Sequence, residues 1–187
     1  MMKILRYEDS LANIAEAEGE TIFLAGPTVR GNQPWLRSWR FDAMFEFRES
    51  KFEGTIIIPE FSNPSESDKG KLWIPRWEFA GLTGCDTIMF WVPRTQELIG
   101  LTTNHEHGYW LGKCREKVVY GRPDIAYRNV YLDVMYEVDA QQRGVEAGTI
   151  YNTMEATIFQ AMVHARNNKG RYRVKSKVPV DSPYGAF

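Results

Sequence analysis

Two carboxylates bracket one of the most apolar stretches of this 187-residue chain. Glu78 precedes the run 86–92 (DTIMFWV), and Glu106 follows it. In a helix–strand–helix unit of a parallel sheet, such groups come close together near one edge of the sheet. An ionised carboxylate can act as a nucleophile, and a protonated one can donate a proton to a leaving group. The pair therefore suggests nucleophilic chemistry with acid assistance.

The sequence predicts that Glu106 lies in the first turn of a helix. Thr102 or Thr103 can cap a helix that begins near Asn104. The helix dipole and the free backbone N–H groups of a first turn favour an ionised carboxylate, which suits a nucleophile. Acids also occur at helix N-termini for stability alone, so this interpretation stays open. By position alone, Glu78 is equally compatible with a solvated helix residue.

Other chemistries are less well supported. His105 and His107 flank Glu106, but residues two apart on a helix do not share a face, and no third metal ligand has suitable spacing. Cys114 lies on an apolar helical stripe, and no G-x-S-x-G elbow occurs. Asp86 begins a strand and is predicted to be a turn or cap residue. We expect neither a metal nor a cofactor.

The overall composition narrows the class of partner. Lys and Arg number 23 and Asp and Glu 24, so the basic excess typical of nucleic-acid binding is missing. No apolar run approaches the length of about 20 residues that spans a bilayer. The two cysteines have no disulfide or zinc spacing. We expect a cytoplasmic protein that acts on a small molecule, without a nucleic-acid polymer or a membrane as partner.

Apolar runs separated by helical patterns predict an α/β fold. Strands are expected at 21–25, 55–60, 86–92 and 117–120, with a short fifth strand at 149–151. Helices are expected at 34–52, 72–83, 104–116 and 152–166, and the segment NVYLDVMYEV also has helical spacing. The predicted fold has three layers around a parallel sheet of about five strands, flavodoxin- or Rossmann-like. One domain, 21–166, follows a peripheral segment, 1–20, with a short helix, and precedes a tail, 167–187.

Ligands of such sheets bind at the carboxyl ends of the strands. The first loop there is GPTVRGNQP, in which Gly26 allows close approach of the backbone to a ligand. Thr28 and Arg30 offer donors for hydroxyls or a phosphate. The loop is neither a G-x-G-x-x-G nor a Walker motif, and it is equally well explained as an ordinary turn between strand and helix.

Three segments resemble the nucleoside 2-deoxyribosyltransferase family, and in particular its phage and bacterial branch. They are TIFLAGP, WEFAGLTGCDTIMFWVPR and TTNHEHGYWLGKCREKVVYG, and the resemblance covers about 21–129. It implies that Glu106, followed by His107 and Gly108, is the nucleophile that attacks the sugar C1′. It implies that Glu78 is an acid beside the base and sugar. Asn129 would be contributed across a subunit interface, which implies a homodimer or higher homo-oligomer with shared active sites.

The chain also departs from that family pattern. The Asp that holds the sugar hydroxyls has no counterpart in GLTTNHE, where Thr103 or Asn104 stands instead. The Tyr of the first family strand falls on Phe23. Related members hydrolyse nucleoside monophosphates, with a basic residue of the first loop near the phosphate, a role that Arg30 would fill.

The sequence therefore predicts cleavage or transfer of an N-glycosidic bond through a glycosyl-enzyme intermediate. The enzyme would be deoxyribosyltransferase-like or a nucleotide N-hydrolase. A nucleotide-binding module without catalysis is the alternative, and the departures from the family pattern favour it. A protein whose many aromatic residues form an oligomer interface is a further alternative.

Overall fold

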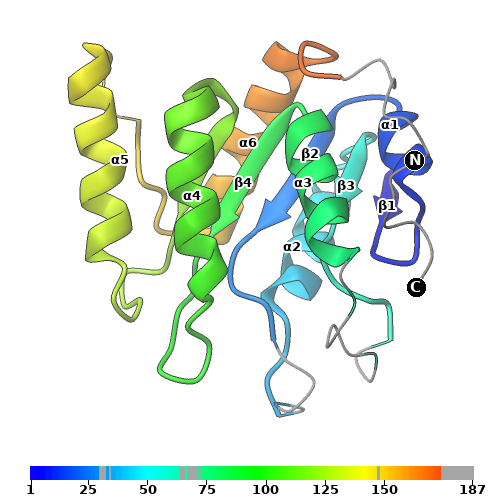
Figure 1. Ribbon diagram of the computed structural model, residues 1–187, viewed down its shortest axis with the longest axis horizontal. Coiled ribbons are helices and arrows are strands. Elements are labelled where there is room, and N and C mark those ends of the chain that lie inside the picture. The colour runs from blue at the N-terminus through cyan, green and yellow to red at the C-terminus, as the bar shows by residue number, and fades with distance from the viewer. Residues whose placement is uncertain are drawn as a thin grey trace.

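The chain forms a five-stranded parallel sheet in a computed structural model that describes residues 1–29, 33, 35–63, 66, 71, 73–146 and 148–173 (Figure 1). The strands are β1 (Lys3–Leu5), β2 (Thr21–Ala25), β3 (Thr55–Ile57), β4 (Thr87–Trp91) and β5 (Val118–Gly121). Their order is β1-β3-β2-β4-β5, and every pairing is parallel. The predicted α/β class, with a parallel sheet of five strands, is confirmed.

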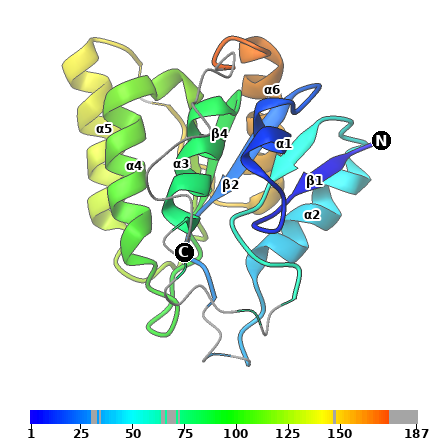
Figure 2. The same ribbon diagram turned by 45° about the vertical axis from the view of Figure 1, so that its right-hand side comes forward.

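Helices cover both faces of the sheet (Figure 2). One face carries α1 (Leu11–Ala15), α3 (Ile74–Gly84), α4 (Leu101–Cys114) and α5 (Val130–Arg143), and a 3₁₀ turn (Arg115–Lys117) joins α4 to β5. The other face carries α2 (Trp39–Glu49) and α6 (Met154–Asn168). Crossovers between parallel strands are right-handed, so the reversal of direction at β3 places α2 and α3 on opposite faces. The connections after β2 and β4 therefore leave the sheet on opposite faces, through α2 and α4.

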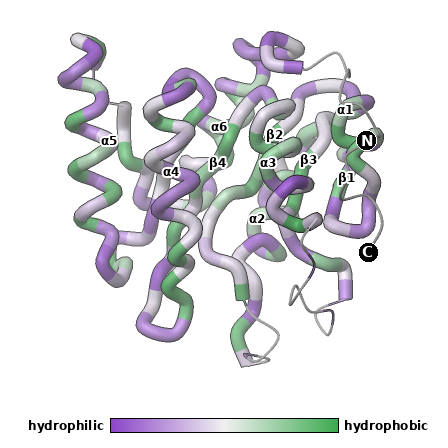
Figure 3. The backbone as a smooth tube through the Cα atoms, viewed as in Figure 1, coloured by the Kyte–Doolittle hydropathy of each residue, from purple (hydrophilic) through white to green (hydrophobic). Residues whose placement is uncertain are grey.

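The two central strands are buried along their whole length, because helices cover both of their faces. Along β4, Met89 and Trp91 pack toward α2 and α6, whereas Ile88 and Phe90 pack toward α3 and α4. Figure 3 shows that the central strands are mostly hydrophobic, whereas the helices around them have both hydrophilic and hydrophobic residues. Within the described ranges, no helix is both long and apolar enough to cross a membrane.

The N-terminal segment is more than the predicted peripheral helix. Helix α1 is present, but β1 precedes it and pairs with β3 as an edge strand. Leu5, Tyr7 and Ile14 are buried in the main core. Three residues are too few for a strand pattern to be recognised in sequence. At the other edge, the predicted strand at 149–151 is reduced to one bridge between Gly121 and Tyr151.

Helix α4 begins at Leu101, three residues earlier than predicted, and this moves Glu106 from the first turn to the second. Its N-cap is Gly100, whose φ of 60° is left-handed, and neither threonine caps the helix. A Cβ at Gly100 would lie 2.6 Å from Cβ of Pro27. The glycine thus permits both the left-handed turn and the close packing of two loops.

Asp86 ties the amino-terminal edge of the sheet together, in keeping with its predicted structural role. Its fully buried carboxylate accepts hydrogen bonds from the backbone N–H and hydroxyl of Thr21, at 2.9 and 2.8 Å, and from Gly170 N at 2.7 Å. The start of β2 and the residues after α6 are therefore joined through one side chain. Residues 174–187 of the predicted tail lie outside the described residues.

We expect Asp86→Ala to lower the free energy of unfolding by about 3–5 kcal/mol, because it leaves buried donors without an acceptor. Asp42→Ala is the control. Asp42 forms an exposed pair with Arg37 at 2.7 Å, and its loss should cost less than about 1 kcal/mol. Urea denaturation measures both. Equal effects of the two substitutions would contradict the role assigned to Asp86.

Candidate active site

Glu78 and Glu106 line the same cavity, as the sequence predicts for groups on either side of one strand. The cavity has a volume of about 370 Å³ and lies between α3 and α4. Its lining residues are Pro75, Glu78, Phe79, Leu82, Thr102, His105, Glu106, Tyr109 and Trp110. Two carboxyl groups, one threonine hydroxyl and one imidazole thus face a space with largely apolar walls. This composition is typical of a small-molecule site.

The electrostatic state of Glu106 differs from the sequence prediction. Burial and then the nearby charge of Glu78 raise its pKa to about 7, and the positive charge of Arg40 opposes them only partly. Glu106 lies in the second turn of α4, beyond the free N–H groups at the helix start. Among the described residues, no donor hydrogen-bonds to its carboxyl group. In the free site, Glu106 is therefore protonated in about half of the molecules near pH 7.

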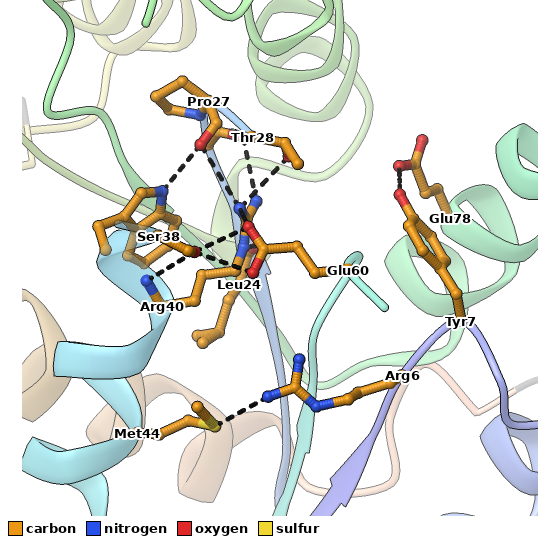
Figure 4. Close-up of polar contacts among 12 residues, drawn as sticks. Arg6, Tyr7, Leu24, Pro27, Thr28, Ser38, Arg40, Met44, Glu60 and Glu78 are labelled. Atoms are coloured by element: carbon orange, nitrogen blue, oxygen red, sulfur yellow. Dashed lines mark hydrogen bonds and ion pairs between the residues drawn. The ribbon is translucent and has the colours of Figure 1, made fainter. Parts of the chain in front are cut away.

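Tyr7 is a site residue that the sequence analysis missed. Its hydroxyl donates a hydrogen bond to Oε1 of Glu78 (Figure 4). The Tyr7 ring is 7% exposed and packs against Phe61 and Trp77, with centroid distances of 5.0 and 5.1 Å. These contacts depend on β1 lying beside β3, and the spacing of residues in sequence gives no sign of that pairing.

A buried arginine holds the loop after β2. The Arg40 guanidinium, 1% exposed, donates to the carbonyl oxygens of Leu24 and Gly26 at 3.0 and 3.1 Å, and to Thr28 Oγ1 at 3.3 Å. It also pairs with Glu60 at 2.8 Å, and Figure 4 shows this cluster. Thr28, a predicted substrate-binding residue, thus accepts a hydrogen bond from Arg40, while its own hydroxyl hydrogen stays available to donate.

Gly26 has a structural reason to be glycine. A Cβ at this position would overlap the carbonyl oxygen of Trp91, so the residue permits close approach of β2 to β4, and its predicted role beside a ligand stays a prediction. The proposed phosphate residue, Arg30, lies outside the described residues.

Two predicted substrate-binding amides are engaged within the chain. Asn104 Oδ1 accepts a hydrogen bond from Nη2 of Arg94 at 2.6 Å, although its residue is exposed on α4. Asn129 is only 2% exposed, and its amide donates to the carbonyl oxygen of Val92 at 2.9 Å. A residue contributed to a neighbouring subunit would need an accessible side chain. The structure instead uses Asn129 to tie the start of α5 to the end of β4.

The two histidines beside Glu106 differ in environment. His105 lines the cavity. His107 is fully buried against Phe90 and Tyr120, with centroid distances of 5.1 and 4.9 Å. Burial lowers the pKa of His107 to about 4, so it is neutral at physiological pH. In the part of the chain that the structure describes, no three potential metal ligands come together.

Comparison with known proteins adds no functional assignment. No protein-family model matches the chain, and no curated protein matches it. The functional inference therefore rests on the residue pattern and on the geometry of the site.

The raised pKa of Glu106 predicts a pH-dependent cost to folding. The ordinary pKa of 4.5 applies in the unfolded chain, and the folded value is about 7. Between these values the folded state binds more protons, so the contribution of Glu106 to stability falls as pH rises through this window. Glu106→Gln lacks this titration. We expect its stability relative to the wild type to increase by roughly 1–3 kcal/mol between pH 4 and pH 8.

Denaturant unfolding of both proteins at several pH values measures this difference. Groups that they share, such as His107 with its lowered pKa, cancel in the comparison. Glu155→Gln, at an exposed acid in the first turn of α6, is the matched control for the loss of one surface carboxylate. A pH-independent difference for Glu106→Gln would show that the Glu106 pKa is not raised.

Proposed function

We propose that this protein cleaves or transfers the N-glycosidic bond of a nucleoside or nucleotide, with Glu106 as the nucleophile. The observation that carries the proposal is the pair of carboxyl groups, Glu78 and Glu106, in one cavity of about 370 Å³. One of them has a pKa near 7, which suits a group that exchanges a proton during catalysis. The family resemblance noted above supports the same assignment.

The pair can supply both a nucleophile and an acid. Near pH 7 the pair carries a proton on Glu106 in about half of the molecules, because the pKa of Glu106 is about 7. Transfer of this proton to Glu78 on substrate binding leaves Glu106 ionised. A Glu106 oxygen then bonds to C1′, the C1′–N bond breaks, and its electron pair stays on the base nitrogen, which takes the proton from Glu78. Attack on C1′ by water, or by a second base, breaks the ester and restores the Glu106 carboxylate, and the proton of the attacking group passes to Glu78.

The identity of the acceptor separates the two forms of the proposal. Water gives an N-hydrolase, and a second base gives a transferase. Phe23, which stands where the transferases have a tyrosine, is buried at 1% exposure and offers no hydroxyl. Tyr7 brings a hydroxyl to Glu78 from a different strand. No metal or cofactor enters this mechanism.

The proposal also covers the cellular compartment, the class of substrate and the oligomeric state. The described cysteines, Cys85 and Cys114, are both free, which suits the reducing cytoplasm. The proposed substrate is a small nucleoside or nucleotide. A homo-oligomer with shared sites follows from the resemblance alone. Asn129 faces its own sheet, so another residue would have to cross the interface.

Glu106→Gln should lower base release by at least about 10³-fold, because the amide can neither attack C1′ nor carry the shared proton. The assay incubates the protein with nucleosides and 5′-monophosphates, with and without acceptor bases, and measures free base by chromatography. Glu155→Gln serves as the control and should retain full activity. Full activity of Glu106→Gln would overturn the proposal. Ligand-induced thermal stabilisation without turnover in the wild type would instead favour a nucleotide-binding module.

The shared proton also predicts the direction of the pH dependence. Glu106 loses its proton as pH rises through about 7. Because the leaving base needs this proton, kcat/KM should fall above that pH. The measurement is kcat/KM from pH 5 to 9 on the best substrate of the panel. A rise through pH 7 would show that Glu106 acts without a proton from the pair.

Tyr7→Phe tests the hydroxyl that holds Glu78. We expect kcat to fall about ten- to hundredfold, with little change in KM, because the acid loses its fixed orientation. Tyr131→Phe, at a residue 68% exposed on α5, is the control. Unchanged kcat in Tyr7→Phe would exclude a positioning role for this hydrogen bond.

A further inference from the structure

The cavity between α3 and α4 has two chemically different ends. Along α4, Thr102 comes one turn before Glu106, and Tyr109 and Trp110 come one turn after it. Along α3, Leu82 comes one turn after Glu78. The acids therefore occupy the end nearer the carboxyl edge of the sheet. Aromatic and aliphatic side chains form the other end.

Three aromatic rings meet at the apolar end. The Phe79 centroid lies 6.1 Å from that of Tyr109 and 6.0 Å from that of Trp110, and the last two are 5.3 Å apart. Trp110 is buried, but Phe79 and Tyr109 are 49% and 40% exposed. These two rings thus leave apolar surface that a planar ligand would cover. Proteins commonly bind nucleobases by stacking them on exposed aromatic rings, and this stacking tolerates any base.

Lys113 determines the polar character of this end. Its ammonium lies 4.9–5.5 Å from the centroids of all three rings. It also donates a hydrogen bond of 2.9 Å to the Tyr109 hydroxyl oxygen. Because that oxygen accepts from Lys113, the hydroxyl hydrogen is free to be donated elsewhere. A ligand at this end therefore meets a hydroxyl donor with a positive charge behind it.

We propose that the cluster of Phe79, Tyr109 and Trp110 is the base subsite. The base lies against Phe79 and Tyr109 with its sugar between the two acids, and the Tyr109 hydroxyl donates to a carbonyl oxygen on the base. The site accordingly prefers oxo bases to amino bases. This inference rests on the proposed function, because the position of the sugar follows from the roles of Glu78 and Glu106.

Hypoxanthine and adenine are a matched pair of probes, since they differ in an oxo or an amino group at one ring position. Isothermal titration calorimetry of the free bases should show hypoxanthine binding about tenfold more tightly than adenine. Tyr109→Phe should abolish that preference. Phe79→Ala should weaken both bases about tenfold. Phe45→Ala, at an aromatic residue 60% exposed on α2 on the opposite face, should change neither.

Base release from inosine and adenosine separates failure of the subsite from failure of the proposed function. Activity with unchanged KM in Phe79→Ala would place the base elsewhere and overturn the subsite alone. Base binding that depends on Phe79 and Tyr109, without any turnover, would support the subsite and overturn the enzyme. Failure of the wild type to bind either base, or equal affinity for both, would overturn the inferred preference. Thermal unfolding of each variant checks that these half-exposed substitutions leave the fold intact.

Discussion

One buried guanidinium holds the edge of the sheet at which the candidate site lies. Arg40 reaches from α2, on one face, to backbone carbonyls at the end of β2 and just after it, and to the Glu60 carboxylate that follows β3. With a 1% exposed side chain, it would be costly to leave unpaired. Its charge also lowers the pKa of Glu106, against the effects of burial and of Glu78. The same residue thus fixes the shape of the loop and moderates the repulsion between the two acids.

Burial of Glu106, followed by that repulsion, determines the electrostatic state of the site. A carboxyl group taken out of water and placed near another carboxylate resists ionisation, and one arginine offsets only part of this effect. The fold maintains Glu106 in such a place because α3 and α4 lie side by side on the same face of the sheet. Functional sites commonly sacrifice stability for reactivity in this way. The Tyr7 hydroxyl gives Glu78 a hydrogen bond, whereas no described residue donates one to Glu106, so the two acids differ in their surroundings before any substrate binds.

Sequence reasoning succeeded where a residue pattern alone determines the structure. The uninterrupted apolar runs around Phe23 and Phe90 predict buried parallel strands, and these runs form the fully buried strands β2 and β4. The positions of Glu78 and Glu106 on either side of β4 were enough to predict their convergence. Sequence reasoning failed where a property depends on packing between distant segments. The pKa of Glu106 depends on burial by α3 and on the actual start of α4 at Leu101, neither of which is written in the local sequence.

Packing between distant segments also explains why the sequence did not predict the role of Asn129 or the aromatic wall of the cavity. Asn129 satisfies the backbone carbonyl of Val92, directly after β4, and only the three-dimensional path of the chain shows that this carbonyl needs a partner. The aromatic wall of the cavity follows from helical spacing, since Phe79 adjoins Glu78 and Tyr109 lies three residues after Glu106. These residues form a cavity wall only because α3 and α4 lie side by side, which helical spacing does not show.

The edge strand β1 links the order of the site to the margin of the sheet. Sheet margins generally open by local unfolding at a lower free energy than central strands, and β1 is an edge strand of three residues. Because Tyr7 directly follows that strand and its hydroxyl bonds to Glu78, each opening would also release the acid. The site would then lose its order by fraying from one margin of the sheet, while the central strands and both helical layers remain folded.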